Sequence, residues 1–521
     1  MAEADRVELA HEPDFVLGRL TVSPVRRALI REGGAQEVLE HRVMQVLIAL
    51  AKARGGVVTR DELMQSCWQG RIVGEDAVNR VMSRLRKAAE AIGTDSFRVE
   101  TVTKIGYRLI ALDAEGKAVP AAGALPASTP GPRITRRAVV AGALALGGTG
   151  LAAGGSLLYR RLGEPAVLAE ASALTIQGRI ALAQGTREGA NQAVGAFRRI
   201  TEIAPDQADG WGLLAIAYVR ASYFRPTNES DALVERGKAA LRHALQQDPG
   251  NAYAILAQTT TLPQMGRWTE GERGLRRALA ARPDDSLIQS VLGNFLNAVG
   301  RFEEALVYLQ KQTRTARPPS EYYTLIQALW GAGRVEELDR MTAQAAALYP
   351  SQFALWFARF YILLYGGQFS AAIAMGEDMG NRPSGIDAEE FDALMAVARA
   401  ARSGARSEID SVMDEQFRRA GQGAGMAENA IQFACLFGRL DDAFTIADAY
   451  YFDRGFVVPD ARFFGSQGSY SPRSARNTRF LFQPSTARMR TDPRFQGIVE
   501  SIGMERYWRE IGVQPDYRRR S

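Results

Sequence analysis

Basic and polar residues that suit the recognition of DNA bases gather between positions 79 and 87. They are Asn79, Arg80, Ser83, Arg84, Arg86 and Lys87. Arg80, Arg84 and Lys87 recur at i, i+4 and i+7, so a helix would place them on one side. Arginine forms a bidentate hydrogen-bond pair with guanine and asparagine with adenine, each contributing roughly 1–3 kcal/mol of discrimination. This pattern predicts a helix that reads the major groove of double-stranded DNA.

The other side of the same segment is apolar. Val78, Met82, Leu85 and Ala89 fall at i, i+4, i+7 and i+11, the spacing of one buried helical stripe. A helix with an apolar back and an Arg/Asn/Ser front is suited to docking in the groove. The alternative is an ordinary exposed helix face that carries Arg and Lys for solubility, and this segment alone does not separate the two interpretations.

The elements around this helix follow the order of a winged-helix domain. The sequence predicts short strands within 15–39, helices over 40–54, 59–68 and 75–91, and a hairpin of strands over 97–103 and 107–111. Gly55-Gly56 ends the first helix, and a capping box formed by Thr59 and Glu62 begins the second. Three helices followed by a hairpin place the basic face on the third helix, directly before the wing.

Three short motifs in this region resemble the C-terminal output domain of OmpR/PhoB-type regulators. They are Cys67-Trp68 before the inter-helix loop, Leu85-Arg86-Lys87 in the third helix and Gly106-Tyr107-Arg108 in the wing. Their order and spacing match over about 100 residues, from 13 to 112. This segment also carries sixteen Lys and Arg against eleven Asp and Glu, a surplus of five that suits a polyanionic partner.

The resemblance implies a role for each polar residue of the segment. Arg80 and Arg84 would contact bases, while Asn79, Ser83, Arg86 and Lys87 would contact bases or phosphates. Lys104 and Arg108 would place the wing on the DNA backbone or in the minor groove. The loop 69–74 would face RNA polymerase, and Tyr107 is expected in the core of the wing rather than on DNA.

Members of this family that answer phosphorelays carry a receiver domain before the module. Here about a dozen residues precede it, so we expect no phospho-acceptor site and a signal that arrives from the C-terminal side.

Residues 113–135 are rich in Ala, Pro and Gly, the composition of a flexible linker. Residues 138–159 follow as 22 uncharged positions between Arg136-Arg137 and Arg160-Arg161. As a helix they would extend about 33 Å, enough for a hydrocarbon core of roughly 30 Å. We therefore predict a single transmembrane helix, in which Gly150 and Gly154 form a GxxxG pattern that would support a homodimer. The alternative is a glycine-rich soluble linker or a buried helix.

Residues 170–455 show a recurring helical period. Prolines that end helices fall at Pro205, Pro249, Pro283, Pro318 and Pro350, at intervals of 44, 34, 35 and 32 residues. Gly266, Gly300, Gly333 and Gly438 occupy the expected turn within each helix pair. This pattern resembles degenerate tetratricopeptide repeats, whose stacked pairs form a superhelix with a groove for a protein or peptide partner. Residues 456–521 are expected to cap the last repeat.

The composition argues against an enzyme. The chain has two cysteines and three histidines, and no cysteine cluster lies near a histidine. No phosphate-binding glycine loop, nucleophile elbow or metal cluster is recognisable. We therefore predict no catalytic residue, no cofactor and no metal.

The order of these parts resembles the CadC/ToxR type of one-component transmembrane regulator. The predicted fold class is multidomain: an α+β winged helix, a single transmembrane helix and an all-α tetratricopeptide-like superhelix. The resemblance implies a single-pass protein of the bacterial inner membrane, with its N-terminus in the cytoplasm and its repeats in the periplasm. Its partners would be promoter DNA, RNA polymerase, the membrane, a protein or peptide in the repeat groove, and a second copy of the chain.

Two other interpretations stay open at this point. One is a soluble activator that combines a winged helix with tetratricopeptide repeats. The other is a protein-interaction scaffold whose winged helix no longer binds DNA.

Overall fold

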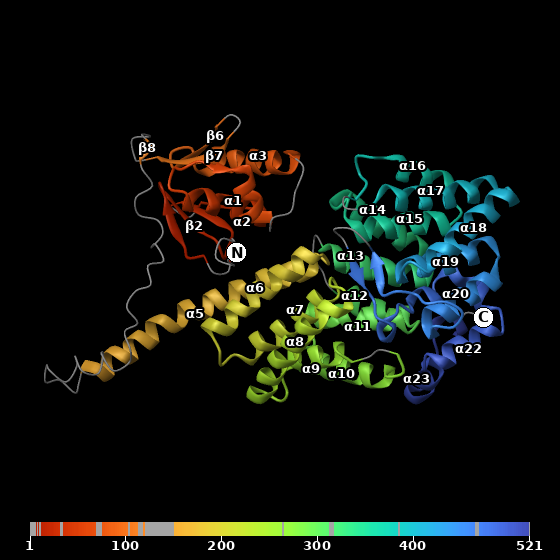
Figure 1. Ribbon diagram of the computed structural model, residues 1–521. Coiled ribbons are helices and arrows are strands. Elements are labelled where there is room, and N and C mark those ends of the chain that lie inside the picture. The colour runs from red at the N-terminus through yellow and green to blue at the C-terminus, as the bar shows by residue number, and fades with distance from the viewer. Residues whose placement is uncertain are drawn as a thin grey trace. The chain divides into compact units, whose positions relative to one another are not determined.

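A computed structural model of the 521-residue chain describes most of its residues. The described residues are 7, 9, 12–31, 35–68, 75–102, 105–112, 118–119, 151–262, 265–311, 317–383, 386–463 and 468–519. They divide into two compact units (Figure 1). The first consists of Met1–Gln177 with Glu202–Ala204, and the second of Gly178–Thr201 with Pro205–Ser521.

The first unit begins with the predicted winged helix. Its elements in chain order are β1 (Phe15–Leu17), β2 (Leu20–Ser23), β3 (Ala28–Arg31), β4 (Gln36–Val38), α1 (His41–Lys52), β5 (Val58–Thr59), α2 (Arg60–Trp68), α3 (Glu75–Ile92), β6 (Phe97–Val102), β7 (Gly106–Leu112) and β8 (Ala118–Val119). Strands β1 to β4 form an antiparallel sheet in sequential order. A second sheet has the order β5-β7-β6, and β8 pairs with β7. The predicted order of strands, three helices and a hairpin is confirmed.

The α3 helix is held by the apolar stripe that its sequence predicts. Val78, Met82, Leu85 and Ala89 are 3, 1, 0 and 7% exposed. The helix packs against α1, β4 and β6, and its stripe joins Leu47 and other α1 residues in one core. Burying this stripe leaves the opposite face of α3 in solvent.

The predicted capping box at the start of α2 is also confirmed. The Thr59 amide donates to a Glu62 carboxylate oxygen over 2.7 Å, and the Glu62 amide donates to Thr59 Oγ1 over 3.2 Å. These bonds satisfy amides that the first turn of a helix leaves without intrahelical acceptors. They also hold the pKa of the Glu62 carboxyl below its usual range.

The prediction of a transmembrane helix over 138–159 is wrong. Residues 138–150 lie outside the described residues, and 151–159 are the first nine residues of α5, which runs over Leu151–Ala183. Nine residues cover about 13.5 Å of helix axis, less than half of a hydrocarbon core, and Arg160, Arg161 and Glu164 follow within the same helix.

No helix in the described part of the chain combines the length and the apolar character that crossing a bilayer requires. The predicted single pass through the inner membrane, with a cytoplasmic N-terminus and periplasmic repeats, is overturned with the helix. Other predictions made near this segment fall on residues that are not described: most of the 113–135 linker, and Gly150 of the GxxxG pattern.

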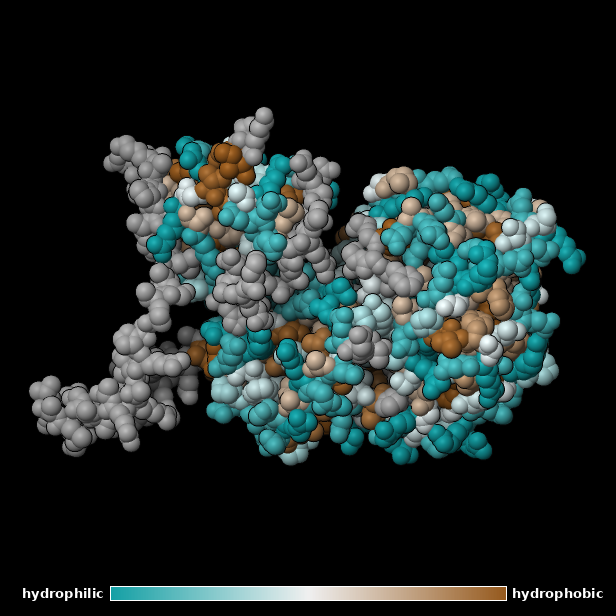
Figure 2. Space-filling view, viewed as in Figure 1, coloured by the Kyte–Doolittle hydropathy of each residue, from teal (hydrophilic) through white to brown (hydrophobic). Residues whose placement is uncertain are grey.

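The second unit consists mainly of helix pairs. Its helices after α5 are α6 (Arg187–Ile203), α7 (Ala208–Ser222), α8 (Thr227–Gln247), α9 (Ala252–Thr260), α10 (Trp268–Ala281), α11 (Ser286–Ala298), α12 (Phe302–Leu309), α13 (Pro319–Ala332), α14 (Val335–Leu348), α15 (Phe353–Tyr365), α16 (Phe369–Glu377), α17 (Ala388–Ser403), α18 (Arg406–Ala420), α19 (Ala424–Phe437) and α20 (Leu440–Phe452). Each odd-numbered helix from α7 on contacts the even-numbered helix that follows. The all-helical character predicted for this region is confirmed. On the visible face of this unit, hydrophobic side chains are scattered among hydrophilic ones (Figure 2).

Glycine forms the turn inside several of these pairs. Gly266, Gly300, Gly333 and Gly438, which the sequence indicated, have φ of 78, 75, 66 and 74°. This left-handed conformation is costly for residues with a Cβ. An arginine follows each of the four, and each arginine pairs with an acidic residue three positions later in the second helix. The same turn therefore recurs with both its backbone and its ion pair.

The chain after α20 runs back along the helix pairs. It contains β9 (Ala461–Phe463), β10 (Ser469–Tyr470), η4 (Arg473–Ala475), η5 (Arg479–Phe482), η6 (Pro484–Thr486), α21 (Ala487–Arg490), α22 (Arg494–Ser501), α23 (Met504–Ile511) and α24 (Asp516–Arg519). We call residues 456–519 the returning segment. It contacts the last pair, α19 and α20, as a cap would, and also α10 and α11.

Hydrogen bonds fix the returning segment to early helix pairs. The Tyr470 amide donates to the Tyr223 carbonyl over 2.8 Å, beyond the end of α7. Thr478 Oγ1 donates to the Ala298 carbonyl over 2.6 Å, at the end of α11. Trp268 Nε1, at the start of α10, donates to the Ile502 carbonyl over 2.7 Å. The segment thus closes over several helix pairs, which a cap on the last repeat alone would not do.

A buried carboxylate in α19 anchors the same segment. Glu428 is 4% exposed, and Arg462 donates to both of its oxygens, over 3.1 and 2.8 Å. Asn477 Nδ2 and Tyr450 Oη also donate to this carboxylate. Burial alone would raise the pKa of Glu428, but the Arg462 charge and these hydrogen bonds outweigh burial and lower it.

We expect Glu428→Gln to lower the free energy of unfolding of this unit by at most about 3–5 kcal/mol at pH 7, because Arg462, whose side chain is 29% exposed, then loses its counter-charge in a partly buried place. Because the pKa of Glu428 is depressed in the folded protein, the wild-type advantage is complete above the unfolded-state value of about 4.3. It should be lost as the pH falls through the folded-state pKa. Chemical denaturation of both proteins at pH 7 and pH 3.5 measures the difference.

The matched control is Glu415→Gln, which removes the carboxylate from the exposed pair of Glu415 with Arg418. An exposed pair contributes about 0–1 kcal/mol, so this variant should unfold almost like the wild type. Equal losses in the two variants would contradict the anchoring role of Glu428.

Candidate nucleic-acid interface

The outer face of α3 carries most of the residues expected to contact DNA. Asn79, Arg80, Ser83, Arg84 and Lys87 are exposed, and Arg86 is half-buried. Among the residues that the structure describes, Arg80 and Lys87 have no ion-pair partner. These two side chains are therefore available to an external anion without the loss of an internal contact.

Arg84 has an internal partner. Its guanidinium pairs with the carboxylate of Glu40, which is the residue directly before α1. The Arg84 and Glu40 side chains are 49 and 63% exposed, so water screens this pair and its contribution is small. The geometry places a negative charge beside the predicted base-reading surface, where it would compete with DNA if Arg84 contacts bases as predicted.

Arg86 faces the wing. Its Nη2 donates to Thr101 Oγ1 over 2.6 Å, and its Nε donates to the Val99 carbonyl over 3.3 Å. Both acceptors lie on β6, so this guanidinium ties α3 to the first strand of the wing. In this position Arg86 orients the helix relative to the wing, and its role as a DNA contact stays a prediction.

Hydrogen bonds through Tyr107 connect α2, α3 and the wing strand β7. Tyr107 Oη donates to Asn79 Oδ1 over 3.1 Å, and Arg60 Nη2 of α2 donates to Tyr107 Oη over 3.4 Å. Tyr107 is 3% exposed, in agreement with its expected place in the core of the wing. The Asn79 amide is thereby oriented by the wing at the start of the exposed face.

The wing is stabilised by its own charges. Arg108 donates from Nε and Nη2 to one oxygen of Glu100, over 2.9 and 2.8 Å, and Arg98 pairs with the other oxygen. The hydrogen bond from Arg108, together with the two arginine charges, lowers the pKa of Glu100. Lys104 and the loop 69–74 lie outside the described residues, so their predicted contacts with DNA and with RNA polymerase stay predictions.

Strand β5 approaches β7 so closely at Gly106 that only glycine fits there. A Cβ on this residue would lie 2.1 Å from the carbonyl oxygen of Val58 in β5, a distance that no packing tolerates. The Gly-Tyr-Arg motif therefore combines a glycine that lets β5 meet β7, a tyrosine that braces α3 and an arginine at the surface.

The described residues contain no group of three or more His, Cys, Asp or Glu that could hold a metal ion. Cys67 and Cys435 are both buried as free thiols, and burial raises their pKa values to about 11 and about 12. A high thiol pKa disfavours the reactive thiolate.

Comparisons with known proteins find relatives of the N-terminal domain by sequence. Residues 34–109 match the family described as "Transcriptional regulatory protein, C terminal". The transcriptional activator CadC of Escherichia coli (strain K12) is 34% identical over 100 residues, which are 19% of this chain and 19% of that protein. The chain thus covers about a fifth of the length of this curated relative.

The solved DNA-binding domain of Escherichia coli CadC is 34% identical in sequence and matches 19% of this chain and 94% of that domain, with a TM-score of 0.18. The family match and the sequence identity identify the N-terminal domain as an OmpR/PhoB-type winged-helix DNA-binding domain. The matched family is one of transcription regulators and not of enzymes, as the sequence predicts.

We expect Arg80→Ala to weaken binding to a duplex that carries the preferred sequence of this protein. The expected loss is about 1–3 kcal/mol, or about 5- to 150-fold in affinity, because Arg80 is exposed on α3 and has no ion-pair partner among the described residues. Fluorescence anisotropy at fixed salt measures the change. Arg26→Ala removes an exposed arginine of the same unit outside α3 and serves as the control; equal affinities of the two variants would refute the assignment.

Glu40→Gln should strengthen DNA binding by about 1.4- to fivefold, since an exposed ion pair contributes about 0.2–1 kcal/mol and its loss frees Arg84. Glu37→Gln changes the net charge equally at an exposed position of β4 and should leave binding almost unchanged. If Glu40→Gln binds no more tightly than Glu37→Gln, the pair does not compete with DNA.

Proposed function

We propose that this protein is a one-component transcriptional regulator that binds promoter DNA through α3 and receives its signal through the helical unit. The observation that carries the proposal is the two-sided α3 helix. One side is buried to 7% exposure or less, and the other presents Asn79, Arg80, Ser83, Arg84 and Lys87 to solvent. The 34% identity to the DNA-binding part of an activator supports the same interpretation.

The proposed docking follows from this geometry. The 18 residues of α3 extend about 27 Å along the helix axis, and the major groove is wide enough for one helix. With α3 in the groove, Arg80 and Arg84 would read bases while Lys87 and the wing residues Lys104 and Arg108 would contact phosphates. RNA polymerase would meet the loop 69–74 on the same domain.

The helical unit is proposed as the sensing part. Its consecutive helix pairs, with the recurring Gly-Arg turn, support an architecture of tetratricopeptide type. A protein or a smaller partner bound to this unit would bias the position or the self-association of the DNA-binding domains. Two joined domains gain affinity through effective concentration, so a homodimer is the proposed active form.

A specific observation favours a second candidate, a protein-interaction scaffold without DNA binding. Three of the arginines expected on DNA already have internal partners: Arg84 with Glu40, Arg86 with β6 and Arg108 with Glu100. If these contacts persisted in every state, the surface would retain mainly Arg80 and Lys87 as DNA contacts. The pairs of Arg84 and Arg108 are partly exposed, and such pairs exchange partners at little cost.

Selection from a random-sequence duplex library with the full-length protein separates the two functions. A regulator enriches one motif, and the logarithm of its binding constant falls linearly with the logarithm of salt concentration. The double variant Arg80→Ala/Arg84→Ala should abolish the enrichment, whereas Arg26→Ala should retain it. The absence of any motif, or the same motif in the double variant, would favour the scaffold.

A further inference from the structure

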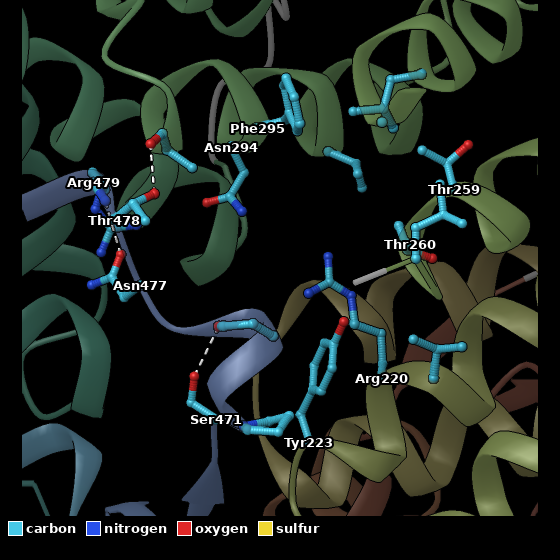
Figure 3. Close-up of a pocket in the computed structure, with 18 of the residues that line it drawn as sticks. Arg220, Tyr223, Thr259, Thr260, Asn294, Phe295, Ser471, Asn477, Thr478 and Arg479 are labelled. Carbon is cyan, nitrogen blue, oxygen red and sulfur yellow. Dashed lines mark hydrogen bonds between the residues drawn. The ribbon is translucent and has the colours of Figure 1, made fainter. Parts of the chain in front are cut away.

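A cavity lies inside the helical unit, between its helices and the returning segment. It has a volume of about 320 Å³, within the size range of small-molecule sites. Figure 3 shows Arg220 of α7, Tyr223 directly after it, Thr259 and Thr260 of α9, and Asn294 and Phe295 of α11 around it, with the returning segment opposite.

The walls of this cavity come from distant parts of the chain and are joined by hydrogen bonds. The amide of Tyr470 reaches the carbonyl of Tyr223, and Thr478 reaches Ala298. Arg479 Nη2 donates to Tyr323 Oη over 2.7 Å, with its guanidinium 5.2 Å from the ring centroid. The cavity is therefore a built feature whose shape depends on the returning segment.

The charge of the lining is positive. Four arginines contribute to it, and none of the described lining residues is Asp or Glu. Arg462 forms an ion pair with Glu428 of α19, which does not line the cavity, and Arg267 forms one with Glu270. The remaining two, Arg220 and Arg479, have no acidic partner in the part of the chain that the structure describes.

The Nε atom of Arg479 is buried without a hydrogen-bond partner among the described residues. A buried donor left unsatisfied is costly. In Figure 3 the guanidinium of Arg220 extends toward the middle of the cavity, opposite Asn294. An anionic group in this space would pair with the guanidinium of Arg220, which has no acidic partner among the described residues.

Apolar surface accompanies the cations. Leu256, Leu275 and Val291 line the helical side, and Phe295 and Tyr223 add aromatic surface. Such a mixture of apolar walls and a few convergent polar groups is typical of sites for small organic ligands. We propose that this cavity binds a small organic anion, with its apolar body against α9, α10 and α11 and its charged group at Arg220.

The proposal that an anion binds in this cavity is argued from the cavity and does not require the proposed function. Only the consequence of binding for transcription rests on the proposed function. As the ligand of the sensing unit, the anion would be the chemical signal that the regulator reads. Because it would touch both the helices and the returning segment, its binding would stabilise the contact between them.

Isothermal titration calorimetry of the full-length protein tests the proposal by measuring its affinity for 2-naphthoate and for the neutral isostere 2-naphthamide. We expect naphthoate to bind, and naphthamide to bind at least about tenfold more weakly, which corresponds to about 1.4 kcal/mol. Arg220→Gln should weaken naphthoate binding by about tenfold or more. Arg220 is exposed at the end of α7, so this variant should fold normally.

The matched control is Arg236→Gln, which removes an exposed arginine of α8 outside the cavity and should bind naphthoate like the wild type. Three outcomes would overturn the proposal: equal binding of naphthoate and naphthamide, unchanged affinity in Arg220→Gln, or no naphthoate binding up to its solubility limit. The Arg80→Ala/Arg84→Ala variant should still bind naphthoate, so a failure of the DNA-binding proposal is distinguishable from a failure here.

Discussion

An amphipathic helix cannot bury its own apolar stripe, and both units of this protein are arranged around that constraint. In the first unit, α3 meets it by packing on α1, β4 and β6, and the packing fixes which residues face outward. In the second unit, each helix pair leaves a face that the next pair or the returning segment covers. The first helices of several successive pairs contact one another: α7 with α9, α11 with α13, and α13 with α15. The surfaces available to ligands are what remains after this burial.

Electrostatic pairing then divides the arginines into two groups. Some, such as Arg86 at β6 and Arg462 at Glu428, hold elements together and are lost to external partners unless those contacts break. Others, such as Arg80 and Arg220, are exposed in their units without an acidic partner among the described residues. A guanidinium is charged at every physiological pH. An unpaired one beside ordered polar groups is therefore the more informative sign of an anion site than the total count of arginines.

The sequence was most informative where one local pattern decides the structure. The stripe through Val78, Met82 and Leu85 predicted α3 to within one residue, because helical periodicity over 18 residues leaves few alternatives. Glycine turns at Gly266 and Gly300 were predicted from their place in the repeat, while the equivalent turns at Gly367 and Gly404 were not predicted.

Interactions between distant residues could not be predicted from the sequence. Nothing local pairs Glu40 with Arg84 or brings Tyr470 to Tyr223. Local composition was misleading at two places. The uncharged run 138–159 suggested a membrane helix although part of it begins the charged α5 helix, and Pro318 was expected to end a helix but precedes α13. In both cases the residue types are compatible with either structure, a membrane or a charged helix in the first and the end or the start of a helix in the second. The neighbouring residues determine which one forms.

The returning segment links the chemistry of the cavity to the stability of the helical unit. Its contacts at Tyr223, Ala298 and Glu428 are spread over three different helix pairs. A ligand that touches only the helices would leave the equilibrium of this segment unchanged, whereas one that also touches Arg479 or Tyr470 favours the closed arrangement by its extra binding energy. A site assembled from both parts is therefore suited to sensing, because occupancy and segment position are thermodynamically coupled. A cavity of the same volume formed by one helix pair alone would bind a ligand without this coupling.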